Sequence, residues 1–128
     1  MTATAFEDGM NVRREMWGPE LAERALQGAS PFAEPFQDLL TRYCFGEVWS
    51  RPGLGRRDRS LLTLSMLIPQ GKALEIKMHT KAALTNGVSV EELREVMVHS
   101  IIYCGVPCAH TALRAMEEAL AEVSEAAK

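Results

Sequence analysis

Apolar side chains recur every three or four positions along most of this chain, which is the spacing of one face of an α-helix. Phe36, Leu39, Leu40 and Tyr43 are a clear example. No segment shows the strict alternation of apolar and polar residues that is typical of a half-buried strand. The pattern therefore predicts an all-α fold, a helical bundle of about six to seven helices.

Glycine and proline divide this pattern into separate helices, because both residues interrupt or end regular structure. The stretch after Asp58 is apolar on nearly every side, so we expect it to form a central helix with Asp58 as its N-cap. The helices we expect are Ala3–Met16, Pro19–Leu26, Glu34–Trp49, Arg59–Ile68, Lys72–Asn86, one from Ser89 to about Cys104, and a last one that opens near Pro107.

One helix start has a specific sequence signature. Ser89-Val90-Glu91-Glu92 matches a capping box, in which the serine hydroxyl and the glutamate carboxylate each accept a hydrogen bond from a backbone N–H of the other residue. We therefore expect a helix to begin directly after Ser89.

Length and charge limit the classes of protein to consider. The 128 residues suit a single domain spanning 1–128, and the net charge of −3 disfavours a nucleic-acid partner. No stretch is long and apolar enough for a membrane span, and Met1–Asp8 lacks the features of a secretory signal. Three cysteines, an odd number, do not form a disulfide framework. We expect a cytoplasmic protein with reduced thiols and no membrane partner.

Glu75 and His79 are candidates for acid–base chemistry. They are four residues apart, so they lie on the same face of the predicted helix. A carboxylate beside an imidazole raises the proton affinity of the imidazole and orients it. A surface ion pair is the alternative interpretation. His99, which follows Glu95 by four residues, is a rival candidate.

Arginines concentrate in one short segment of this acidic chain. Arg51, Arg56, Arg57 and Arg59 lie within nine residues, and a guanidinium binds carboxylates or phosphates through its planar fork. We expect Arg59 to be partly buried in the first turn of its helix, and Arg56 and Arg57 to lie in a solvated loop. The segment lacks the glycine and lysine spacing of a phosphate-binding loop.

Cys104, Cys108 and His110 form a third cluster. A zinc site needs four convergent ligands, and three at this unfamiliar spacing do not supply them. We interpret the cysteines as buried, unreactive thiols and expect no bound metal.

Six motifs occur in order along the chain, namely Phe36-Gln37-Asp38-Leu39, Gly46-Glu47-Val48-Trp49-Ser50-Arg51-Pro52-Gly53-Leu54, Arg59-Ser60-Leu61-Leu62-Thr63, Glu75-x3-His79, Asn86-Gly87-Val88 and Tyr103-Cys104-Gly105-Val106-Pro107. Together they resemble the carboxymuconolactone decarboxylase family, over a range from Gly9 to about Ala119. Related alkylhydroperoxidase D-type proteins carry Cys-x-x-Cys-x3-His with an upstream glutamate. Here Lys72 and Glu75 replace the two cysteines, and Ser60 stands in place of the glutamate, so a dithiol peroxidase reaction is excluded.

This resemblance implies an alkylhydroperoxidase D-like helical fold and a homo-oligomer, a hexamer or a trimer. It also implies a carboxy-lyase that converts 4-carboxymuconolactone to 3-oxoadipate enol-lactone and carbon dioxide in protocatechuate degradation. The lactone carbonyl takes up the electrons that the departing carboxylate releases, so we expect no cofactor and no metal.

The resemblance suggests roles for six residues. Protonated His79 would supply the proton or donate a hydrogen bond to the developing enolate oxygen. Glu75 would orient His79 and keep its pKa high enough to hold that proton. Arg51 or Arg59 would bind a substrate carboxylate. The pocket walls would be Trp49 and Tyr103.

Some positions depart from the family pattern. Pro69–Leu74 differs from the usual loop before the glutamate, and Cys108 and His110 replace small or amide residues. One alternative is therefore a decarboxylase of a related lactone or keto acid. Another is a non-catalytic oligomeric protein, and a third is redox chemistry through Cys104 and Cys108.

Overall fold

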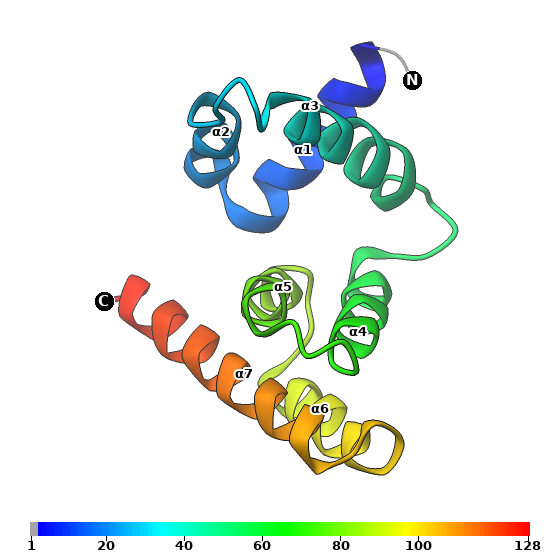
Figure 1. Ribbon diagram of the computed structural model, residues 1–128, viewed down its shortest axis with the longest axis vertical. Coiled ribbons are helices and arrows are strands. Elements are labelled where there is room, and N and C mark those ends of the chain that lie inside the picture. Colours follow the sequence, from blue (N-terminus) through cyan, green and yellow to red (C-terminus); the bar gives the residue numbers. More distant parts are fainter. Residues whose placement is uncertain (1–2) are drawn as a thin grey trace. The chain divides into compact units, whose positions relative to one another are not determined.

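The chain forms two compact units, Met1–Gly55 and Arg56–Lys128, in a computed structural model that describes residues 3–128 (Figure 1). Its regular elements over this range are all helices, which confirms the all-α prediction. None of these described helices is both long and apolar enough to cross a lipid bilayer. That residues 1–128 act as a single domain remains a prediction.

One helix of the first unit changes its winding along its length. The predicted helix over residues 34–49 is present, but it is wound as an α-helix only in its first part and as a π-helix after that. Long π-helical runs are rare, and the hydrophobic spacing gave no sign of one. The elements of this unit are α1 (Ala3–Trp17), α2 (Pro19–Gln27), α3 (Glu34–Leu39) and η1 (Leu40–Trp49).

Helices α1 and η1 cross at two glycines. A Cβ atom added to Gly9 would overlap the backbone carbonyl of Thr41, and one added to Gly46 would overlap the carbonyl of Ala5. Only glycine permits so close an approach of two backbones. This crossing also packs the ring of Trp17 edge-on against Phe45, with 5.6 Å between their centroids.

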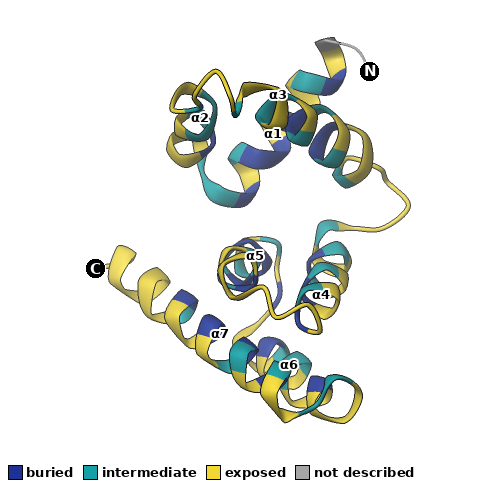
Figure 2. Cartoon of the chain, viewed as in Figure 1, coloured by how far each residue is buried: buried dark blue, intermediate teal, exposed yellow. Residues whose placement is uncertain are grey.

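The second unit has an aliphatic core among four helices. Figure 2 shows that the buried positions form stripes along these helices, while the last turns of α7 are exposed. Its helices are α4 (Arg56–Leu67), α5 (Ala73–Thr85), α6 (Val90–Cys104) and α7 (Val106–Ala126). The core consists of Leu64, Ile68, Ile76, Ala83, Val88, Leu93, Ala112, Ala115 and Met116.

The start and the environment of α4 differ from our expectation. The helix begins at Arg56, so Asp58 lies inside its first turn and is not the N-cap. It is not a central helix either, because Leu62 and Met66 are 43% and 62% exposed. The absence of a polar stripe therefore did not indicate burial on all sides. Leu64 is the apolar side chain of α4 that is completely buried, and Ile68, directly after the helix, is completely buried as well.

The capping box at the start of α6 is confirmed. The backbone N–H of Glu92 donates to Ser89 Oγ at 3.1 Å, and the N–H of Ser89 donates to Glu92 Oε1 at 3.0 Å. Arg57 forms an ion pair with the same Glu92 carboxylate. Arg57 therefore links the start of α4 to the start of α6 and does not lie in a solvated loop.

Glutamates of α7 form ion pairs with two lysines of α5. Lys77 forms ion pairs with Glu118 and Glu122, and Lys81 donates to Glu122 Oε1 at 3.0 Å. The hydrogen bond from Lys77 lowers the pKa of Glu122. These ion pairs connect α5 to α7.

Candidate functional site

Glu75 and His79 lie one turn apart on α5, as the spacing predicts. The helix buries Ile76, Thr80 and Ala83 in the core of the second unit, and this orients the remaining positions. Glu75 is exposed, whereas His79 is half-buried and its Nδ1 atom is fully buried. The imidazole is therefore partly removed from water, and the carboxylate is not.

Burial sets the proton affinity of His79. Desolvation lowers the pKa of His79 below its usual value, and the nearby negative charge of Glu75 raises it by a smaller amount. A buried imidazolium loses its hydration, so the neutral form is favoured. Glu75 therefore acts on the pKa of His79 in the expected direction, but burial has the larger effect, and the net pKa is lowered.

The two rival histidines lie in surroundings that differ from those of His79. His99 on α6 and His110 on α7 are both exposed. The ring of His99 packs against Tyr103 with 5.1 Å between centroids. His79 is therefore the most enclosed of the three histidines.

Arg59 and Arg51 differ in their burial. Arg59 is half-buried in the first turn of α4, as expected, and its Nε atom is buried. Arg51 is exposed just after η1. Beside Arg59, the buried Ser60 hydroxyl accepts a hydrogen bond at 3.0 Å from the side chain of Asn86 directly after α5. This bond connects the start of α4 to the end of the helix that carries His79.

The two aromatic candidates belong to different units. Trp49 ends η1 in the first unit and packs on Phe45, with 6.2 Å between ring centroids. Tyr103 lies near the end of α6 in the second unit and is 77% exposed. That these two rings form the walls of one pocket remains a prediction.

The cysteines are free thiols in the structure. Cys104 and Cys108 are half-buried against the apolar core of the second unit, and Cys108 Sγ lies 3.9 Å from the carbonyl oxygen of Pro69. Within residues 3–128, no three His, Cys, Asp or Glu side chains are grouped to hold a metal ion.

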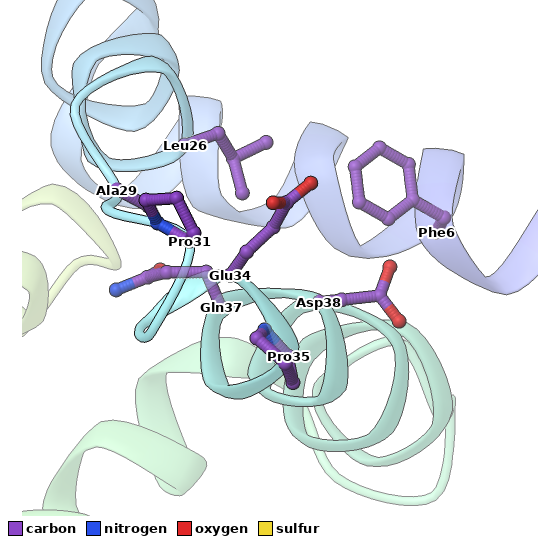
Figure 3. A pocket seen from close by; sticks show the side chains of 8 residues that line it. All are labelled: Phe6, Leu26, Ala29, Pro31, Glu34, Pro35, Gln37 and Asp38. Atoms are coloured by element: carbon purple, nitrogen blue, oxygen red, sulfur yellow. The ribbon is translucent and has the colours of Figure 1, made fainter.

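The first unit contains a cavity of about 510 Å³ where α1, α2 and α3 meet (Figure 3). Its walls combine the apolar side chains of Phe6 and Leu26 with the carboxylates of Glu34 and Asp38. Asp38 is ion-paired with Arg42. A dianionic substrate would be repelled by this lining, so the cavity does not suit the predicted lactone.

A second cavity, of about 450 Å³, lies between α5 and α7. Its charged lining residues are Lys77, Arg114 and Glu118. Lys77 already forms ion pairs with the carboxylates of α7. The lining of this cavity therefore carries one more cation than anion.

Arg13 is a buried charge that the sequence interpretation did not single out. It is only 8% exposed and lies on α1, one position after the buried Val12. A signal was present in the sequence, because Gly9, Val12 and Met16 follow helical spacing and Arg13 falls within that stripe. A charged residue on an apolar helical face indicates a specific role or a specific partner.

The fold and the motifs define the class of protein. The family model for carboxymuconolactone decarboxylases matches residues 34–118. The chain belongs to the carboxymuconolactone decarboxylase family, as its motifs predict.

Two relatives refine this assignment. A nitrosuccinic acid decarboxylase of Metarhizium robertsii is 47% identical over 102 residues, which cover 80% of this chain and 71% of that protein. A 4-carboxymuconolactone decarboxylase of Acinetobacter baylyi is 39% identical over 113 residues, which cover 88% of this chain and 84% of that protein. Both relatives are named as decarboxylases, in agreement with the predicted carboxy-lyase class.

Proposed function

We propose that this protein is a cofactor-independent decarboxylase that converts 4-carboxymuconolactone to 3-oxoadipate enol-lactone and carbon dioxide in the cytoplasm, within protocatechuate degradation. The family match and the 39% identity to a 4-carboxymuconolactone decarboxylase support the substrate. The structural observation that carries the proposal is the half-buried His79 with Glu75 one turn before it.

The proposed reaction needs one proton and a site for the released electrons. The bond between the ring carbon and its carboxylate breaks, and carbon dioxide leaves. The electron pair moves through the double bond into the lactone carbonyl and forms a dienolate. Protonation of the α carbon then gives the enol-lactone, so the substrate itself accepts the electrons.

His79 is the proposed proton donor. Its lowered pKa makes the imidazole neutral in the chain without ligand at neutral pH. A substrate with two carboxylates brings negative charge to the site, and that charge raises the pKa of a nearby imidazole. In this proposal His79 becomes protonated when substrate binds and delivers that proton to the dienolate. Glu75 orients the ring and stabilises its charged form.

The remaining candidates bind and enclose the substrate in this proposal. Arg59, which is half-buried, or Arg51 pairs with a substrate carboxylate through the guanidinium fork. Trp49 and Tyr103 supply apolar walls that exclude water, which favours loss of charge from the departing carboxylate.

Turnover of the His79→Gln variant tests the assignment. The loss of a proton donor should lower kcat by about 10²–10⁴-fold. His99→Gln is the matched control, because His99 is exposed on another helix, and it should retain normal turnover. Carbon dioxide release and the NMR spectrum of the enol-lactone report the reaction. Normal turnover by a folded His79→Gln variant would refute the proton-donor role.

The pH profile of Glu75→Gln tests the positioning role of Glu75. The carboxylate raises the pKa of His79, so its removal should lower that pKa further. Activity that requires a protonated His79 should then decline at a lower pH than in the wild type. A change in kcat without any displacement of the pH profile would contradict this role.

A second candidate substrate is nitrosuccinic acid. The 47% identity to a nitrosuccinic acid decarboxylase favours it. Loss of the carboxylate next to the nitro group would send the electron pair into that group as a nitronate, which needs one proton and no cofactor. The same His79 could supply this proton. Parallel assays with both compounds distinguish the two functions, and a related lactone or keto acid is tested in the same way.

A non-catalytic oligomer is the remaining alternative, and the exposure of Glu75 is a feature that this alternative also predicts. Decarboxylation of neither compound would support it.

We propose a homo-oligomer, a hexamer or a trimer, in either case. Exposed apolar side chains at the junction of α6 and α7 support assembly, namely Ile102, Tyr103 and Val106. Light scattering that shows only monomer would contradict the oligomer.

A further inference from the structure

The cavity of Figure 3 has room for a small molecule and a largely apolar lining. Its volume of about 510 Å³ falls within the usual range of small-molecule pockets. Phe6, Leu26, Pro31 and Pro35 supply apolar surface to it. All of its lining residues belong to the first unit, so the site does not depend on where the second unit lies. The cavity can therefore accept the apolar part of a ligand.

The charged part of the lining is acidic. Glu34 and Asp38 lie one turn apart on α3 and both border the cavity, and none of the described residues that line it is a lysine, arginine or histidine. Figure 3 shows the Glu34 side chain extending from α3 toward the space between Leu26 and Phe6. Negative charge beside an apolar wall attracts a cation and repels an anion.

Only one polar side chain of this lining remains available to a ligand. Asp38 pairs with Arg42 at 2.9 Å, and Gln37 Oε1 accepts a hydrogen bond from Arg13 at 3.0 Å. Within residues 3–128, the side chain of Glu34 forms neither a hydrogen bond nor an ion pair. The carboxylate of Glu34 is therefore the group that can compensate the charge of a bound cation.

Residues of this lining already bind one organic cation, which is a side chain of the protein itself. The guanidinium of Arg42 lies 5.1 Å from the centre of the Phe6 ring and donates to Asp38. A carboxylate beside an apolar or aromatic surface is a favourable environment for such a group. Glu34 and Leu26 offer the same combination to a ligand inside the cavity.

We propose that this cavity binds a small organic cation, an ammonium group on an apolar stem, through the carboxylate of Glu34. Glu34 is exposed, whereas Phe6 and Leu26 are half-buried, so the ammonium group stays close to water while the stem contacts the apolar wall. The site belongs to the first unit and His79 to the second, and the proposal does not depend on the proposed function.

Titration with hexylammonium, followed by NMR, tests the proposal. 1-Hexanol has the same stem without the charge, and hexanoate reverses the charge. Hexylammonium should shift the signals of Phe6 and Leu26 and bind about 5- to 20-fold more tightly than 1-hexanol, and hexanoate should bind less tightly than either. Equal affinities of hexylammonium and 1-hexanol, tighter binding of hexanoate, or shifts confined to other residues would overturn the proposal.

Glu34→Gln removes the charge that the proposal requires, and Glu47→Gln is its matched control. Glu47 is exposed on η1 of the same unit and does not line the cavity. Glu34→Gln should bind hexylammonium about 5- to 20-fold less tightly than the wild type, and Glu47→Gln should bind it as the wild type does. Unchanged affinity in Glu34→Gln, or an equal loss in both variants, would overturn the site.

Two further measurements separate binding from a structural role. Glu34 is exposed, so the Tm of Glu34→Gln should stay near that of the wild type. Glu34→Asp keeps the charge and should bind hexylammonium more tightly than Glu34→Gln does. Equal affinities of Glu34→Asp and Glu34→Gln would overturn the role of the carboxylate, even if both variants unfold at a lower temperature than the wild type.

Discussion

The two units of this protein are stabilised in different ways and place their cations differently. The first unit brings the backbones of α1 and η1 together at Gly9 and Gly46, and it buries Arg13 among neutral partners. The second unit packs aliphatic side chains around Leu64 and keeps its α5 lysines at the surface against carboxylates. A buried cation without an anion costs stability, whereas paired surface cations cost little. The first unit therefore keeps a buried cation among neutral partners, whereas the second unit keeps its lysines in ion pairs.

The largest effect is expected from a cavity in the second unit. Leu64 is completely buried, so Leu64→Ala should lower the free energy of unfolding by about 2–5 kcal/mol. Met66 on the same helix is 62% exposed, and Met66→Ala should change it by less than about 0.5 kcal/mol. Urea unfolding measures both variants. Equal effects would show that α4 is covered on both sides in the assembled protein.

The first unit should respond to the addition of a methyl group. Gly9→Ala places a Cβ against the backbone carbonyl of Thr41 and should cost about 1–3 kcal/mol. Gly53→Ala is the control, because nothing lies within 4 Å of a Cβ at that position. If Gly9→Ala leaves the free energy of unfolding unchanged, the close crossing of α1 and η1 is refuted. The contrast drawn between the first and the second unit would then lose its support from the first.

A smaller effect is expected at the start of α6. Ser89→Ala removes the hydroxyl that accepts the N–H of Glu92, and it should cost about 1 kcal/mol. Ser89→Thr keeps an acceptor and should retain most of the stability. Loss of stability in Ser89→Thr as large as in Ser89→Ala would contradict a role for the hydroxyl as a cap.

The smallest effect concerns the pH dependence of stability. Burial lowers the pKa of His79 below its usual 6.5, so the unfolded chain binds this proton more readily than the folded chain. Folding stability should therefore be unaffected by His79 well above pH 6.5 and should decrease as the pH falls below that value. Urea unfolding from pH 8 to pH 5 should show a smaller decrease for His79→Gln than for the wild type. A decrease in stability for His79→Gln as large as that of the wild type would contradict the assignment.

Helix positions were predictable because their signals are local. Pro19, the Ser89–Glu92 capping box and the end of the helix near Asn86 depend on residues within one or two turns, and the structure confirms them. The start of α4 was misplaced by a few residues, since Asp58 offers a capping side chain but Arg56 and Arg57 already take helical conformation. The π winding of η1 has no local signal in the spacing of apolar residues.

The candidate site was only partly readable from the sequence. The spacing of Glu75 and His79 places them on one face, and the motifs identified the family. The direction of the pKa shift of His79 was not predictable, because it depends on how much protein covers the ring. Arg13 escaped notice for the same reason, since its neutral partners come from positions 24–32 residues further along the chain.

The sequence by itself determined the helices, their ends and the family, because these follow from hydrophobic spacing, capping side chains and motif order. Tertiary structure alone decided which polar groups lose contact with water. The half-burial of His79, the close crossing at Gly9 and the enclosure of Arg13 depend on helices that meet from distant parts of the chain. Desolvation is a property of the surroundings, so a residue's chemistry in this protein follows from its neighbours in space.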